Sequence, residues 1–338
     1  MTRGRRTRPS RLALIASLGV LALLGAGLTA PTAADEPGRA PTGSAARGSA
    51  TAGLVSSSLP ALPTTVLGNA VGTARQAPAL PGGGRKVFGR KRFLVAYYGT
   101  AGTAALGVLG EGTPDAMHRR LVRAGKPFKR KGERVQPVYE LIVTVADAVP
   151  GPDGDYNHDV LHSRVQEYID AAQRNKALLV LDIQPGRSDF LTVAKRWEWA
   201  LKHPWVGLAL DPEWRMGPDQ VPGQVIGSVR AKEVNEVSAW LDALTAAEGL
   251  PEKVFMIHQF RSSMVSRANK VKDRPRLAEV QHVDGFGTPS QKLATYGALA
   301  RPRQFTMGFK LFYDEDVPRM RAGAVRRIRP AVRFVSFQ

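Results

Sequence analysis

The chain has 338 residues, with 48 Lys and Arg against 29 Asp and Glu, and no cysteine. This length allows two average domains, or one barrel-sized domain once non-globular segments are set aside. The lack of cysteine excludes disulfide bonds, thiolate metal sites and an acylated cysteine anchor. The net charge of +19 favours a polyanionic partner. We expect no nucleic acid, because the sequence has no helix-turn-helix, RNA-binding or zinc-finger pattern.

The first 34 residues are predicted to be a signal peptide. Five arginines and no acid precede an uncharged apolar run at residues 12–28. Small residues at Thr32, Ala33 and Ala34 favour cleavage after Ala34, so we expect a secreted, extracellular protein associated with the cell envelope. A retained anchor is the alternative, since about 17 apolar residues are the lower limit for a bilayer span. We expect membrane contact only in that case.

Residues 35–85 are predicted to be a disordered linker. They are rich in Ala, Pro, Gly, Ser and Thr, and they end in Pro81-Gly82-Gly83-Gly84. Such a segment buries too little apolar surface to offset the entropy of ordering it. Without the signal peptide, 43 basic residues remain against 29 acidic ones, a net charge of +14. An exported basic protein of this kind would meet an anionic cell-wall polymer or a polysaccharide, and a merely solvated basic face is the alternative.

Residues 86–338 are predicted to form one α/β domain, a (β/α)8 TIM-like barrel. Short β-branched and apolar runs alternate there with amphipathic stretches, which is typical of parallel strands joined by helical crossovers. The eight runs are residues 93–99, 136–146, 177–184, 206–214, 253–259, 280–287, 307–314 and 332–337, and helical patterns cover 160–174, 190–203, 231–248 and 291–299. No residues remain for a final helix after the last run, and an open doubly wound sheet is the alternative.

Polar residues follow the apolar part of most predicted strands. They are Asp182, Asp211, Glu213, His258, Gln259, Asp284 and Asp314. In a barrel the carboxyl ends of the strands meet at one face, where barrel enzymes place their active sites. Several carboxyl groups brought together there raise the pKa of at least one of them, as acid catalysis requires.

Asp211-Pro212-Glu213-Trp214 is the most informative motif. Residues two apart on a strand point to one side, with Cα atoms about 6.5 Å apart, so both carboxyl groups enter one pocket. Mutual repulsion would keep one protonated as a general acid, while the other stays ionised. Trp214 offers an apolar face on which a sugar ring stacks.

At this motif the chain resembles TIM-barrel glycoside hydrolases, namely the family 25 lysozymes and the family 18 chitinases. Both carry an Asp-x-Glu at the end of the fourth strand, so the resemblance implies Glu213 as proton donor and Asp211 as its partner. The chain departs from the lysozymes in ending its first strand with Tyr97-Tyr98-Gly99, without an acid. The residues we expect to contact substrate are Asp182, Trp214, Tyr98, His258, Gln259, Asp284, Tyr313 and Asp314.

The favoured interpretation is a secreted barrel that acts on an envelope or extracellular polysaccharide, with no cofactor and no assigned metal ligand. Two alternatives stay open. Glu140, Asp182, Glu213, Asp284 and His258 could form a divalent metal site of the sugar-isomerase type. The barrel could also bind cell-wall polysaccharide without cleaving it.

Overall fold

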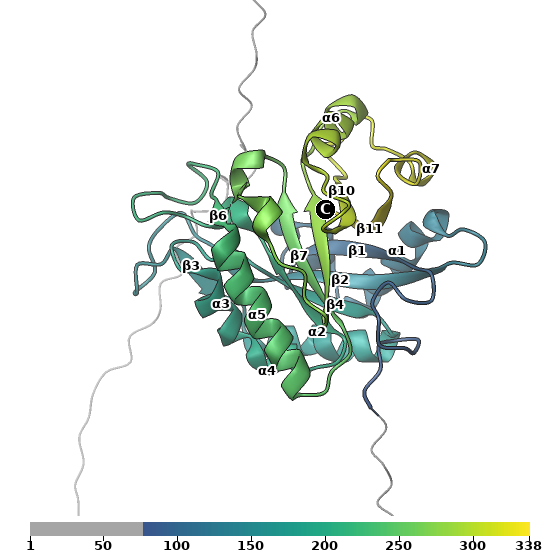
Figure 1. Cartoon of the computed structure of the whole chain (residues 1–338), viewed down its shortest axis with the longest axis horizontal. Coiled ribbons are helices and arrows are strands. Elements are labelled where there is room, and N and C mark those ends of the chain that lie inside the picture. Colours follow the sequence, from purple (N-terminus) through teal and green to yellow (C-terminus); the bar gives the residue numbers. More distant parts are fainter. Residues whose placement is uncertain (1–76) are drawn as a thin grey trace, which may run out of the picture. The chain divides into compact units, whose positions relative to one another are not determined.

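The computed structural model describes residues 77–338, which form a closed barrel of parallel strands (Figure 1). Strand β1 pairs with both β11 and β2, and this double pairing closes the sheet. The barrel strands are β1 (Arg92–Thr100), β2 (Arg134–Ala146), β4 (Leu178–Ile183), β5 (Val206–Leu210), β7 (Lys253–Gln259), β9 (Leu277–Val283), β10 (Thr306–Leu311) and β11 (Val332–Phe337). All eight predicted strands are confirmed, and the closure decides for the barrel over the open sheet.

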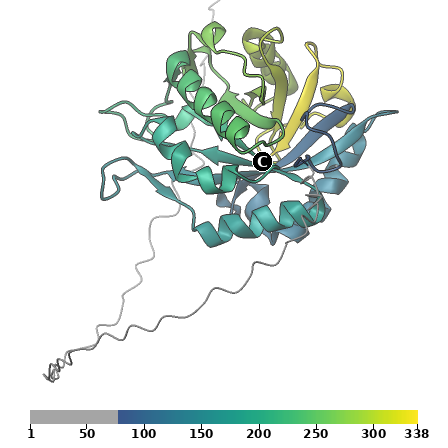
Figure 2. The same cartoon turned by 60° about the horizontal axis from the view of Figure 1, so that its bottom comes forward.

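The helices lie outside the strands (Figures 1 and 2). They are α1 (Pro114–Gly125), α2 (His162–Asn175), α3 (Phe190–Arg196), α4 (Glu198–Leu201), α5 (Ala231–Ala247), α6 (Pro289–Leu299) and α7 (Ala322–Val325). The crossover from β7 to β9 instead carries 3-10 turns and the short strand β8 (Val265–Ser266), which pairs with β6 (Val229–Arg230). Strand β3 (Asn157–Asp159) extends the sheet beside β2. Within residues 77–338, no helix follows β11.

Side chains alternate between two environments along each barrel strand, as the strand period of two requires. Those that point outward pack against the helices in one large apolar core. Those that point inward form a smaller apolar cluster in the amino-terminal part of the barrel. Its members include Leu94 of β1, Val180 of β4, Met256 of β7 and Phe334 of β11. The inward positions that follow toward the carboxyl ends are polar.

The packed body begins before residue 86, where the linker was predicted to end. Leu80 is buried and belongs to the inward-facing cluster, together with Val87. Arg92 donates hydrogen bonds to the carbonyl oxygens of Pro81 and Gly83, which hold this segment across the amino-terminal mouth. Residues 77–85 are therefore part of the barrel domain. The predicted signal peptide and the linker up to residue 76 lie outside the described residues.

None of the helices in residues 77–338 has the length and apolar character that a bilayer span needs.

The inward position of Gly207 on β5 leaves no room for a side chain. A Cβ atom there would lie 2.5 Å from the carbonyl oxygen of Val254 on the neighbouring strand β7. We expect Gly207→Ala to lower the free energy of unfolding by about 2 kcal/mol or more, because backbone on both strands must move. Gly297→Ala is the control: it adds a Cβ with nothing within 4 Å on exposed α6, and we expect a gain of roughly 0.5 to 1 kcal/mol. Chemical denaturation measures both, and equal effects would contradict this account.

Candidate active site at the carboxyl-terminal mouth

The inward-facing residues at the carboxyl ends of the barrel strands form one buried polar layer. Each is at most 7 % exposed. The layer consists of Tyr98, Glu140, Asp182, Asp211, His258, His282, Asp284, Lys310 and Ser336. Strand register brings them together, since Tyr98 lies opposite Glu140 and His258 lies opposite His282. Partly exposed Glu213 lies just beyond the layer.

Asp182 is held by Tyr98. The Tyr98 hydroxyl donates a hydrogen bond of 2.7 Å to Asp182 Oδ2. Burial raises the pKa of Asp182 to about 6, although the nearby His258, Tyr98 and Lys310 oppose the shift. Lys310 Nζ lies 3.6 Å from the centre of the Tyr98 ring, so its positive charge stands against the aromatic face. Both residues therefore stabilise a negative charge on Asp182.

His258 lies between two carboxyl groups. Its Nδ1 atom is 2.9 Å from Asp284 Oδ2, in a hydrogen bond, and its Nε2 atom is 3.0 Å from Glu140 Oε1. The second contact is not aligned as a hydrogen bond. Burial alone would lower the pKa of His258, but the carboxyl groups of Asp284, Glu140 and Asp182 outweigh it and raise that pKa well above its ordinary value.

Asp211 and Glu213 do come close, but not as neighbours on a strand. Strand β5 ends at Leu210, and Pro212–Trp214 forms a 3-10 turn. Pro212 has no N–H for the ladder, and Asp211 Oδ1 instead accepts a hydrogen bond from Glu213 N at 3.2 Å. The predicted extension of the strand through Trp214 was wrong. The turn projects Glu213 toward the mouth and leaves Asp211 below it.

Asp211 and Glu213 are buried to different extents. Burial raises the pKa of Glu213 to about 7, and the negative charge of Asp284 adds to this shift. Burial also raises the pKa of Asp211 well above its ordinary range, with Asp182 and Glu213 adding to the effect. The expectation that Asp211 stays ionised while its partner is protonated is therefore not supported. Asp211 is the more deeply buried acid, with 3 % exposure.

Three residues expected to contact substrate lie away from the polar layer. Gln259 is on the outward side of β7, where its Oε1 atom accepts a hydrogen bond from Gln281. The prediction for Gln259 was wrong because successive side chains on a strand point to opposite sides, so His258 and Gln259 cannot both face inward. Tyr313 stacks on Phe337 and contacts the Tyr97 hydroxyl, on the helix side of the barrel. The third, Asp314, is exposed in the loop after β10. Trp214, by contrast, does lie at the mouth, where it is half-buried.

Several residues of the mouth, Ser336 among them, were not among the predicted site residues. Lys310 and His282 point inward from β10 and β9, and alternation from the apolar Phe309 and Val283 would have indicated both. Phe286, which follows β9, is 50 % exposed, and its ring meets Phe312 edge to face. Nothing in the sequence distinguishes Phe286 from a buried aromatic residue.

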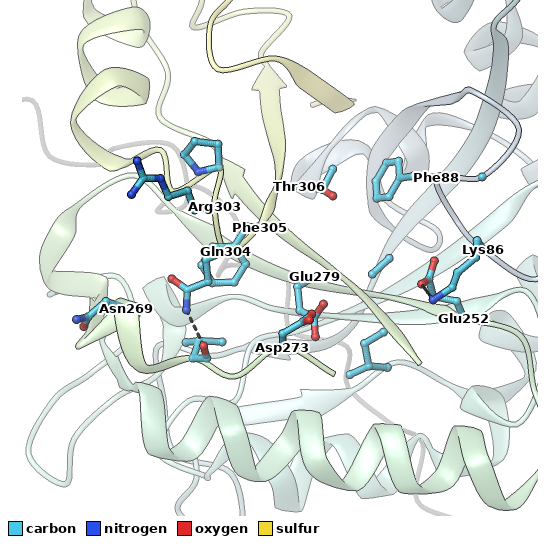
Figure 3. A pocket seen from close by; sticks show the side chains of 15 residues that line it. Lys86, Phe88, Glu252, Asn269, Asp273, Glu279, Arg303, Gln304, Phe305 and Thr306 are labelled. Atoms are coloured by element: carbon cyan, nitrogen blue, oxygen red, sulfur yellow. Dashed lines mark hydrogen bonds and ion pairs between the residues drawn. The ribbon is translucent and has the colours of Figure 1, made fainter. Parts of the chain in front are cut away.

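A groove of about 770 Å³ lies at the opposite, amino-terminal mouth (Figure 3). Its lining includes Lys86, Glu252, Asp273, Glu279 and Arg303, around the beginnings of β9 and β10. Lys86 and Glu252 are paired with one another at 2.8 Å. The candidate active site is nevertheless at the carboxyl-terminal mouth, because buried acids from four strands or strand ends converge at that mouth.

Comparison with known proteins identifies no family. Neither a protein-family model nor a curated protein matches the sequence. Among solved structures, the chain is similar to a hyperthermophilic endo-β-1,4-glucanase in complex with substrate, with 9 % identity over 73 % of this chain and 88 % of that chain and a TM-score of 0.39. A likeness this distant carries no argument about activity, and the barrel itself follows from the strand pairing.

Glu279 in the groove gives a test of the local electrostatics. Burial raises the pKa of Glu279 from 4.5 to about 8, and Asp273 contributes. An acid with a raised folded-state pKa costs stability above its unfolded pKa, and this penalty grows as the pH rises from about 4.5 to about 8. We expect Glu279→Gln to match the wild type near pH 4.5 and to be more stable by about 1 to 3 kcal/mol at pH 8. Urea denaturation across this pH range measures the difference.

The matched control is Glu252→Gln. Glu252 accepts hydrogen bonds from Lys86 Nζ and Val87 N, so its neutral replacement loses an ion pair and gains nothing. We expect this variant to be no more stable than the wild type at any pH. A Glu279→Gln variant whose advantage does not grow with pH would contradict the assignment.

Proposed function

We propose that the protein is a glycoside-hydrolase-like barrel that cleaves an envelope or extracellular polysaccharide, with Glu213 as the proton donor. The observation that carries the proposal is the position of Glu213. It stands partly exposed at the mouth, above a layer of buried acids, and burial together with the negative charge of Asp284 raises its pKa to about 7. An acid with this pKa is still partly protonated near neutral pH and can therefore serve as the donor to a glycosidic oxygen.

A second carboxyl group at the same mouth supports the proposal. Asp284 is close enough to Glu213 for its charge to raise the Glu213 pKa, and His258 Nδ1 fixes its orientation. In this arrangement Asp284 supplies the negative charge that stabilises the developing oxocarbenium ion, either directly or through water. Asp211 has a positioning role, since its Oδ1 atom accepts the hydrogen bond from Glu213 N that shapes the turn.

The surroundings suit a sugar polymer. Half-buried Trp214 and half-exposed Phe286 offer aromatic faces on which sugar rings stack. The positive charge of the chain favours an anionic cell-wall polymer. Secretion, predicted from residues 1–34, completes the proposal.

Replacement of Glu213 by glutamine tests the assignment. Glutamine keeps the size of the side chain but cannot donate the proton, so we expect cleavage of peptidoglycan and other wall glycans to fall by about 100-fold or more. The wild-type rate should decline as the pH rises through about 7, because Glu213 then loses its proton. New reducing ends measure both effects. Glu236→Gln, an exposed carboxyl change on α5, should leave the rate unchanged.

The alternatives give different results in the same assay. Equal binding of glycan by wild type and Glu213→Gln, with no cleavage by either, would identify a barrel that only binds polysaccharide. Cleavage that Glu213→Gln retains, but that a chelator abolishes and added metal restores, would identify a metal-dependent enzyme. Either result would contradict Glu213 as the acid.

A further inference from the structure

Three buried side chains below the mouth present free ligand atoms to one another. Glu140 of β2, His258 of β7 and His282 of β9 each offer one atom, and these atoms all lie within 4.8 Å of one another. All three side chains are fully buried. The strand register fixes this juxtaposition, because His258 and His282 are opposite one another on paired strands.

The second ring nitrogen of each histidine is already occupied. His258 Nδ1 is 2.9 Å from Asp284 Oδ2, and His282 Nε2 is 2.7 Å from Ser336 Oγ. Histidines that bind metals are held in this way, with the other ring N–H directed to a carboxylate or another oxygen. The contacts leave His258 Nε2 and His282 Nδ1 facing Glu140.

The atoms that face one another have no hydrogen-bond partner in residues 77–338. They are both carboxyl oxygens of Glu140, His258 Nε2 and His282 Nδ1. Buried polar atoms without a partner are costly, and a buried carboxyl group more so. We propose that Glu140, His258 and His282 bind one divalent transition-metal ion.

Gly308 on β10 provides the space that this arrangement needs. A Cβ atom at Gly308 would lie 2.3 Å from His282 Nδ1, the atom assigned as a ligand. Any other residue would therefore push the imidazole away from Glu140 and His258. The close approach of the β10 backbone keeps His282 Nδ1 directed at the other two ligand atoms.

The ligand set selects the class of ion. Two imidazole nitrogens and one carboxylate suit Zn²⁺, Co²⁺ or Fe²⁺, whereas Mg²⁺ and Ca²⁺ prefer oxygen alone. Tetrahedral zinc with ligand bonds of 2.0 to 2.1 Å keeps its ligand atoms roughly 3.3 Å apart. The 3.0 Å between Glu140 Oε1 and His258 Nε2 is close to this separation, and the ligand atom of His282 lies within 4.8 Å of both. The fourth position is left for water.

Metal binding is measured directly on the untagged full chain, so the result does not depend on glycan cleavage. Protein freed of metal by dialysis against a chelator is titrated with Zn²⁺ and with Co²⁺. We expect one equivalent of each per chain, the visible absorption of tetrahedral Co²⁺, and a rise in melting temperature on loading. A bound fraction below about 0.2 equivalents, with no Co²⁺ spectrum, would overturn the site and leave His258 as an imidazolium between two carboxylates.

Variants test the identity of the ligands. We expect His282→Gln and Glu140→Gln to weaken Zn²⁺ binding by more than about 100-fold, and Asp284→Asn, which alters the support of His258, by about 10-fold to 100-fold. His158→Gln, a change at an exposed histidine on β3, should bind as the wild type does. Circular dichroism confirms that each variant is folded. Loss of binding in His158→Gln, or full binding in the folded ligand variants, would contradict the assignment.

Discussion

The pairing of β1 with both β2 and β11 is the constraint on which the site depends. It joins the first and last strands of the domain, so that residues from Tyr98 to Ser336 share one interior. In an open sheet the same residues would extend along an edge and remain hydrated. Closure removes most of that water, and burial is accordingly the largest cause of the raised pKa values of Asp182, Asp211 and Glu213. The chemistry proposed here is thus a consequence of the topology.

Closure also divides the interior into two layers with opposite roles. The amino-terminal layer is apolar and is sealed by Leu80 and Val87, which come from the segment before β1. The carboxyl-terminal layer is polar and costs stability, because few of its charges are fully paired. The apolar layer and the outer core together offset that cost. A site with this many buried acids therefore needs the barrel to be complete.

The sequence was sufficient for the order of strands and for the acids at their ends. Apolar runs of strand length separated by helical periodicity predicted all eight strands, and the acids that follow them predicted Asp182, Asp211, Glu213 and Asp284 at one mouth. Two kinds of error had local causes. Gln259 was assigned to the site although His258 already took the inward position, and the turn at Pro212 was assigned to a strand. Both errors come from the alternation of side chains along a strand. The first did not decide which residues face inward, and the second did not decide where the strand ends.

Other features depend on contacts between distant segments, which a single sequence does not contain. Whether Lys310 meets Tyr98, or His282 meets Ser336, is decided by register across the closed sheet. The same holds for the packing of residues 77–85, whose composition resembles that of a linker but whose Leu80 finds an apolar interior to enter. The groove at the amino-terminal mouth is likewise built from four separate loop segments, which precede β1, β7, β9 and β10.

The two proposals for this mouth meet at Asp284. His258 Nδ1 is hydrogen-bonded to the carboxyl group of Asp284, and the negative charge of Asp284 contributes to the raised pKa of Glu213. A divalent ion bound by His258 would hold that imidazole in place and fix Asp284 with it, whatever reaction takes place above. Because the groups are linked through His258, changes at Glu140, His258 and Asp284 should not act additively. The polar layer is therefore best regarded as one electrostatic unit, in which the lower residues position the acids that face the substrate.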